Sequence, residues 1–214
     1  MWNPDMHAHT IILSGLRGLV ELYMATGKTE YLEEAKRVHD NVLDKYMWVT
    51  GGIGEVLSTP FETKDETCQV VDWLRGTFRL WQATGDPKYM DVAELVYFNH
   101  LLFNQDFTGG FCAYRSIGIG PATAMASRDF VAWFCCSMHG TRELAEGIKY
   151  IYTQDVDAVY VNLFAASEVK LEVGGGTVTL RQPNDLTGDL DVTVEVSPRK
   201  TSEFTLRLRI PCWA

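Results

Sequence analysis

Two hydrophobic periodicities divide this chain near residue 154. Before that point apolar residues recur at every third or fourth position, the spacing that places them on one face of an amphipathic helix. After it apolar and polar residues alternate, which is typical of strands that bury one face and expose the other. The pattern predicts an α+β multidomain chain, with a helical domain over residues 1–153 and a strand domain over residues 154–214. The alternating segments are residues 159–163, 169–173, 177–182, 190–196 and 204–210.

The helical part contains an internal repeat. Leu16-Arg17-Gly18 recurs 58 residues later as Leu74-Arg75-Gly76. With the same offset, Ala25-Thr26-Gly27 recurs as Ala83-Thr84-Gly85. Each copy predicts a helix that ends at a glycine in the left-handed conformation and is followed by a second helix. The repeat therefore indicates one helical hairpin that is used twice.

The flanks of the repeat extend this prediction. The second helices are expected to begin at Thr29 and at Asp86-Pro87, where Thr or Asp would cap the helix and Pro would occupy its first position. A further helix is expected over residues 141–151, and a short strand over residues 111–116. Helical hairpins of this size build α/α toroids, and a closed toroid needs more hairpins than two. We therefore predict the later part of a toroid followed by the start of an antiparallel β-sandwich, truncated at both ends.

Composition and charge exclude several classes of protein. A net charge of −9 argues against binding to a nucleic-acid backbone. No apolar run approaches the roughly 18 residues of a membrane span, and the first residues do not resemble a signal peptide. Five cysteines without a repeated spacing favour reduced or metal-bound thiols. We predict a cytoplasmic protein with no membrane or nucleic-acid partner, whose exposed apolar helix faces cause self-association.

Two short segments carry the residue types of a metal site. Cys135 and Cys136 are adjacent, and Glu66 and Cys68 lie two residues apart. Zinc prefers four ligands of these types. Glu66 and Cys68 can share a face only if the backbone between them is extended, which we expect just before the helix over residues 70–84. The residues alone leave two alternatives open for the cysteine pair: buried core thiols, or a disulfide between neighbours.

These segments resemble a known family. Glu66-Thr67-Cys68, Cys135-Cys136 and the strand at residues 206–213 are similar to the β-L-arabinofuranosidase family of glycoside hydrolases. His7-Ala8-His9-Thr10 resembles the His-Ala-Asn-Thr helix start of that family, with His9 departing from the Asn. The resemblance covers nearly the whole chain. It implies an (α/α)6 catalytic toroid followed by β-sandwich domains.

The resemblance also implies a chemistry. Glu66, Cys68, Cys135 and Cys136 match the ligands of a Zn²⁺ ion in that family. Cys135 matches the nucleophile of a retaining double displacement on a carbohydrate substrate, with sulfur in place of the usual carboxylate. A nearby metal favours the thiolate that such a nucleophile requires.

The remaining site residues are less specified by the sequence. A retaining glycosidase needs an acid/base carboxyl, for which Glu55 is our first choice and Glu62 the second, although both could equally be solvated loop carboxylates. His7 and His9 are expected to contact substrate. One alternative is a non-catalytic, zinc-stabilised sugar-binding relative or an inactive fragment, favoured by the short loop around Glu55. A further alternative is a toroid enzyme that acts as a lyase or an epimerase, in which Cys135 and Cys136 are only buried core thiols.

Overall fold

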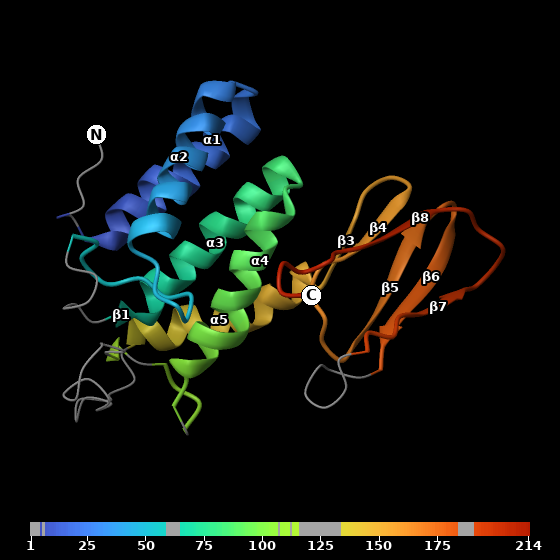
Figure 1. Ribbon diagram of the computed structural model, residues 1–214. Coiled ribbons are helices and arrows are strands. Elements are labelled where there is room, and N and C mark those ends of the chain that lie inside the picture. The colour runs from blue at the N-terminus through green and yellow to red at the C-terminus, as the bar shows by residue number, and fades with distance from the viewer. Residues whose placement is uncertain are drawn as a thin grey trace. The chain divides into compact units, whose positions relative to one another are not determined.

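The chain forms two units, Met1–Leu144 and Ala145–Ala214 (Figure 1). The computed structural model describes residues 5, 7–58, 65–106, 108–111, 113–115, 134–183 and 191–214. Most of the helical residues that the structure describes lie in the first unit, and most of the strand residues lie in the second. The predicted mixture of helices followed by strands is therefore confirmed.

The first unit is built mainly from helices. Their bounds are η1 (Thr10–Arg17), α1 (Gly18–Thr26), α2 (Thr29–Lys45), α3 (Thr67–Thr84), α4 (Pro87–Leu95), η2 (Val96–Leu101) and α5 (Phe134–Gly147). A two-stranded antiparallel ribbon joins β1 (Asp65–Glu66) to β2 (Ala113–Arg115), at the place where the sequence predicted a short strand. None of the helices in the described ranges combines the length and apolar character needed to cross a bilayer.

The repeated Ala-Thr-Gly turn closes both hairpins in the same way. Gly27 and Gly85 adopt left-handed φ angles of 71° and 69°, and each donates its N–H to a carbonyl four residues earlier. Thr26 and Thr84 each donate their hydroxyl to the carbonyl four residues before and accept an N–H two residues after. The hydroxyl therefore links the last helical turn to the start of the next helix. This shared geometry is the physical reason that the three residues recur together.

The predicted starts of the second helices are confirmed in position but only partly in mechanism. Pro87 begins α4, and the Asp86 side chain accepts the Lys88 N–H, as the sequence predicted. Thr29 begins α2, but the residue at the cap is Lys28, which makes no side-chain capping bond. The expectation that Thr29 caps this helix is therefore wrong.

Helix α3 forms the centre of the first unit. Almost all of its first fourteen residues are buried, with Trp73 and Phe78 among the largest fully buried side chains. Gly76 permits a close approach, because a Cβ placed there would lie 2.6 Å from Leu16 Cδ2. Helices η1, α1 and α4 pack against α3. The Leu-Arg-Gly motif of the second repeat thus lies at a close, buried helix contact rather than on a surface.

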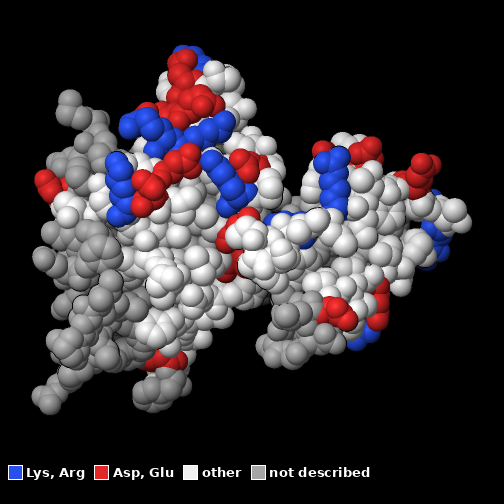
Figure 2. All heavy atoms as spheres, in the orientation of Figure 1, with Lys and Arg blue, Asp and Glu red and all other residues white. Residues whose placement is uncertain are grey.

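The helices of this unit carry both a buried ion pair and exposed ion pairs. Arg75 on α3 pairs with Glu143 on α5 at 2.7 Å, with both side chains buried. Over α1 and α2, side chains of both signs are interspersed on the face drawn in Figure 2. Glu33 with Lys36 and Glu21 with Arg79 contribute to these exposed pairs. Exposed pairs of this kind stabilise little, whereas the buried pair fixes how α5 meets α3.

Helix α5 begins earlier than the sequence predicted. The predicted helix was residues 141–151, whereas α5 starts at Phe134 and a short 3-10 segment, η3 (Ile148–Tyr150), follows it. The first turn of α5 therefore contains Cys135 and Cys136. The exposed apolar side chains of Phe134 and Met138 weakened the helical pattern in this turn, because they do not face the core.

The described residues of the second unit form two three-stranded sheets. Their strands are β3 (Tyr152–Gln154), β4 (Ala158–Val161), β5 (Ser167–Val173), β6 (Gly176–Gln182), β7 (Glu195–Pro198) and β8 (Thr205–Leu208), in the orders β3-β4-β8 and β5-β6-β7. Strands β5 and β6 form the predicted hairpin, with Gly174 and Gly175 at positive φ in its turn.

Two features of the strands differ from the prediction. Strand β4 pairs with β8 in parallel, so the expectation of wholly antiparallel pairing is wrong for this pair. The reason is that the whole β5-β6-β7 sheet is inserted between them, so the chain returns to β4 from a distance instead of through a hairpin. Every residue of β7 is exposed, and β8 has no buried residue, so these two strands do not bury the predicted apolar face.

Candidate metal and catalytic site

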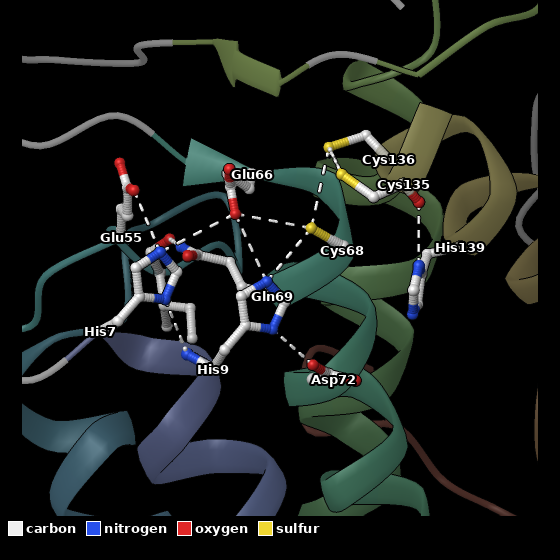
Figure 3. Close-up of polar contacts among 11 residues, drawn as sticks. His7, His9, Glu55, Glu66, Cys68, Gln69, Asp72, Cys135, Cys136 and His139 are labelled. Atoms are coloured by element: carbon white, nitrogen blue, oxygen red, sulfur yellow. Dashed lines mark hydrogen bonds and ion pairs between the residues drawn. The ribbon is translucent and has the colours of Figure 1, made fainter. Parts of the chain in front are cut away.

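Four segments of the first unit place their polar side chains together (Figure 3). They are the residues before η1 with His7 and His9, the loop with Glu55, the β1–α3 junction with Glu66 and Cys68, and the first turn of α5. Glu66 has extended backbone angles of φ −119° and ψ 134°, and α3 begins at the next residue. The helix was predicted over residues 70–84, so α3 starts three residues earlier than expected and already contains Cys68. The Cys68 thiol lies 3.6 Å from Glu66 Oε2, so the two side chains do share a face, although only Glu66 is extended.

Three thiols converge beside that carboxylate. Cys68 Sγ lies 3.8 Å from Cys136 Sγ, which lies 3.9 Å from Cys135 Sγ. All three are free thiols, so the alternative of a disulfide between neighbours is not found. Cys68 and Cys136 are buried and Cys135 is partly exposed. Cys68 and Cys136 are therefore core thiols by burial, whereas Cys135 is not, and their sulfurs lie beside one another.

These separations fit a zinc ion. Zinc–sulfur bonds of about 2.3 Å place two sulfurs of a tetrahedral site about 3.8 Å apart, and a sulfur and a carboxylate oxygen about 3.5 Å apart. The sulfur pairs at 3.8 and 3.9 Å, and the Cys68–Glu66 pair at 3.6 Å, match these edges. Soft thiolate donors favour zinc over harder cations such as calcium or magnesium.

His9, the residue just before η1, contacts the same cluster. Its Nε2 is 3.2 Å from Cys68 Sγ and 3.4 Å from Glu66 Oε2, and its Nδ1 is 2.6 Å from Asp72 Oδ2. The prediction from sequence did not include Asp72. A signal for it exists, because a carboxylate interrupts the apolar run at the start of α3, four residues and one helical turn after Cys68.

The charges of this group are shifted by their mutual contacts. Burial lowers the pKa of His9, but its hydrogen bonds to Asp72 and Glu66 outweigh burial and raise that pKa to about 9. The hydrogen bond from His9 lowers the pKa of Glu66. The group therefore favours a carboxylate beside a cationic ring.

The three thiols are also inequivalent. The hydrogen bond from the Cys68 thiol lowers the pKa of Cys136 to about 7, whereas the same contact raises the pKa of Cys68. Burial raises the pKa of Cys135. Among the three thiols, Cys136 therefore loses its proton first as the pH rises. A thiolate at Cys135 needs an added positive charge nearby.

Glu55 is held by His7 at the other end of the site. His7 Nε2 lies 3.0 Å from Glu55 Oε1 and 3.9 Å from Glu66 Oε2. The Ala8 N–H also donates to the Glu55 carbonyl at 2.8 Å. With a side chain that is 25% exposed, Glu55 is a partnered, half-buried carboxyl rather than a fully solvated one. Glu62 lies outside the described residues.

The loop that carries Glu55 is fixed from beneath by polar contacts. A Cβ at Gly52 would lie 2.2 Å from the buried ring of His100, so only glycine allows this approach. His100 in turn pairs with the buried Asp65 at 2.9 Å, and Gln69 donates to the Ile53 carbonyl at 2.7 Å. The glycines of this loop therefore serve packing. His100 and Asp65 were not predicted from the sequence, since no spacing relates them.

Comparison with known proteins gives matches along most of the chain. The profile described as "Beta-L-arabinofuranosidase, GH127 catalytic domain" matches residues 3–147, and "Beta-L-arabinofuranosidase, GH127 middle domain" matches residues 158–214. A search of curated proteins finds no match.

Solved structures extend the comparison. A GH127 β-L-arabinofuranosidase from Geobacillus stearothermophilus T6 is 27% identical, with a TM-score of 0.75 over 92% of this chain and 34% of its own. The GH127 β-arabinofuranosidase BT3674 is 25% identical, with a TM-score of 0.79 over 98% of this chain and 34% of its own. A protein described as a glycoside hydrolase is 21% identical and shares the fold, with a TM-score of 0.80 over 98% of this chain and 41% of its own. The chain thus spans about a third of the length of the first two structures.

Proposed function

Because this chain belongs to the GH127 β-L-arabinofuranosidase family, we propose that it acts as a retaining glycoside hydrolase on a carbohydrate with a β-L-arabinofuranose-type sugar. The observation that carries the proposal is that Cys68 Sγ lies 3.8 Å from Cys136 Sγ and 3.6 Å from Glu66 Oε2, with Cys135 Sγ 3.9 Å from Cys136 Sγ. Each of these three separations is close to an edge of a zinc tetrahedron. The type of sugar that the whole protein accepts is itself part of this proposal.

Glu66, Cys68, Cys135 and Cys136 would hold the Zn²⁺ ion. When bound, the ion supplies positive charge that stabilises thiolates. This charge meets the need left by burial of Cys135, whose pKa is otherwise raised. Cys135 is also the most exposed of the three thiols in the cluster, so it is the one that a substrate can reach.

Cys135 and Glu55 would divide the chemistry of a double displacement. The Cys135 sulfur attacks the anomeric carbon and forms a carbon–sulfur bond, while the bond from that carbon to the leaving oxygen breaks and Glu55 donates its proton to this oxygen. Glu55 then removes a proton from water, whose oxygen displaces the sulfur and restores the original configuration. His7, at 3.0 Å from Glu55, orients that carboxyl, and the proposed substrate contacts are His7 and His9, whose rings stack.

The fold supports the same proposal at the level of its domains. We place residues 1–153 in a partial (α/α)6 toroid, supported by the repeated hairpin, and residues 154–214 in a partial β-sandwich, supported by its two sheets. Exposed apolar side chains on α5, such as Phe134 and Met138, support self-association. Free thiols suit a reducing compartment, so the proposed location is the cytoplasm.

A second candidate is a non-catalytic, zinc-stabilised sugar-binding protein. It is favoured by the short loop around Glu55, the residue that the catalytic candidate needs as its acid/base. Covalent labelling separates the two candidates, because only a catalytic protein transfers a glycosyl group to the Cys135 sulfur. Mass spectrometry of a peptide with one added glycosyl group on Cys135 would exclude the second candidate.

Metal analysis combined with a panel of nitrophenyl glycosides tests the proposal. We expect one zinc per chain, turnover of an arabinofuranoside, and loss of turnover in Cys135→Ser. The control is Cys212→Ser, which removes an exposed thiol that is not in the cluster and should retain activity. A metal-free protein with full activity would overturn the proposal, and an unsaturated product absorbing in the ultraviolet would indicate a lyase instead.

A further inference from the structure

His9 contributes a donor atom that the three-thiol and carboxylate set does not require. Its imidazole nitrogen is one of the donor types that zinc prefers in proteins. We infer that His9 Nε2 is a further ligand of the zinc ion, held in place by Asp72. This inference rests on the proposed zinc site and extends it.

The distances around His9 match those of a ligand. His9 Nε2, Glu66 Oε2 and Cys68 Sγ form a triangle with sides of 3.2, 3.4 and 3.6 Å. Zinc–nitrogen bonds of about 2.0–2.1 Å and zinc–sulfur bonds of about 2.3 Å place the nitrogen and sulfur of a tetrahedral site about 3.5 Å apart. The triangle therefore resembles one face of a coordination polyhedron. It shares Cys68 with the triangle formed by the three thiols.

The orientation of the ring supports the same role. Asp72 Oδ2 lies 2.6 Å from Nδ1, which directs Nε2 towards Cys68 and Glu66 (Figure 3). Histidines that bind metals almost always donate their other ring N–H to a carboxylate or carbonyl, and this contact sets the ring orientation and raises its basicity. Asp72 is buried at 4% exposure, so its position is fixed by packing in α3. The ring also stacks on His7 at 5.1 Å with an interplanar angle of 7°.

His7 is a weaker candidate for the same role. Its Nε2 lies 3.0 Å from Glu55 and 3.9 Å from Glu66, in a group that contains no sulfur. A position between two carboxylates suits a hydrogen-bonding role towards the acid/base. The two stacked histidines therefore divide their functions, with His7 facing Glu55 and His9 facing the thiols.

A fifth donor changes the role of Cys135. With His9 added, the donors proposed for the ion number five, one more than the four that zinc prefers. Cys135, the most exposed thiol of the cluster, can then face the substrate while the metal stays fully coordinated. The added histidine thus separates holding the ion from attacking the sugar.

X-ray absorption at the zinc edge tests the inference without measuring activity. The full chain is loaded with one equivalent of zinc, and the wild type is compared with His9→Asn and with His139→Asn as a control. The His139 ring lies 2.9 Å from the Cys135 carbonyl and is absent from the donor groups. We expect sulfur scattering in all three proteins, and the outer-shell scattering of an imidazole in the wild type and His139→Asn but not in His9→Asn.

The outcomes separate this inference from the zinc site itself. Zinc bound by sulfur without imidazole scattering in the wild type would overturn the role of His9 and leave the thiol site intact. A wild type that takes up no zinc would overturn both. In competition with a chromophoric chelator, His9→Asn and Asp72→Asn should each bind zinc about 10–100-fold more weakly than wild type. Unchanged affinity in both variants would also overturn the inference.

Discussion

His9 and Asp72 are joined at 2.6 Å between Nδ1 and Oδ2, although 63 residues separate them in the chain. The contact links the start of η1 to the second turn of α3. It leaves the opposite edge of the imidazole facing Cys68 and Glu66. The His9–Asp72 pair thus joins two helical segments, and sites built on helices are held more accurately than sites on loops.

Loss of Glu55 should reveal its role through the leaving group. Glu55→Gln keeps the shape of the side chain but removes the acid, so we expect a 10²–10⁴-fold loss in kcat/KM on a sugar with a poor leaving group. Nitrophenyl leaving groups need little protonation, so the loss there should be much smaller. Equal losses on both kinds of substrate would contradict the assignment of Glu55 as the acid/base.

The buried pair of Arg75 and Glu143 should be sensitive to the removal of one partner. Glu143→Gln removes the carboxylate that pairs with the buried Arg75 guanidinium, and we expect a loss of about 3–5 kcal/mol in the free energy of unfolding. Urea denaturation measures this loss. The control is Glu21→Gln, which breaks the exposed pair with Arg79 and should cost about 0–1 kcal/mol. Similar losses in both variants would show that burial does not decide the strength of these pairs.

Gly76 should not tolerate a methyl group. The Cβ of Gly76→Ala would lie 2.6 Å from Leu16 Cδ2, so we expect overpacking to cost about 1–3 kcal/mol. Gly15→Ala is the matched control, because a Cβ there meets nothing within 4 Å and alanine favours a helix. Thermal unfolding should show a lower Tm for Gly76→Ala and an equal or higher Tm for Gly15→Ala. A Gly76→Ala protein as stable as wild type would contradict the close packing of η1 on α3.

His39 should make the stability of the protein fall in mild acid. Its fully buried ring stacks on Trp73 at 4.6 Å and meets Tyr89 edge-on at 4.8 Å. Burial lowers the pKa of His39 to about 4, against the weaker opposing effect of Asp40. The unfolded chain therefore takes up this proton first as the pH falls. The contribution is complete above about pH 6.5 and is lost towards pH 4, by about 3 kcal/mol in all.

Urea denaturation at pH 7, 6 and 5 checks this prediction. In His39→Phe the ring can keep its contacts but cannot titrate, so stability should fall less between pH 7 and 5 than in the wild type. Parallel pH dependence in the two proteins would contradict the assignment. The fall attributed to His39 is the difference between them, since other groups titrate in both.

The sequence determined the local structure of this protein because local structure depends on neighbours in the chain. The period of the apolar residues gave helices and then strands, and the recurring Ala-Thr-Gly turns marked where α1 and α3 end. The extended backbone at Glu66 followed from its place just before a helix. The convergence of the thiols could be expected from the residue types and the family resemblance. Chain order could not give the start of α5, whose first turn exposes Phe134 and Met138.

Tertiary structure decided the contacts that join distant segments. Nothing in the spacing of His9 and Asp72, or of His100 and Asp65, relates one to the other. These pairs form because packing of helices and loops around α3 removes the side chains from water, and a buried polar group must find a partner. The parallel pairing of β4 and β8 is of the same kind, since it depends on where an intervening sheet returns the chain. The sequence therefore supplies the donors, and the packing around α3 determines which of them meet.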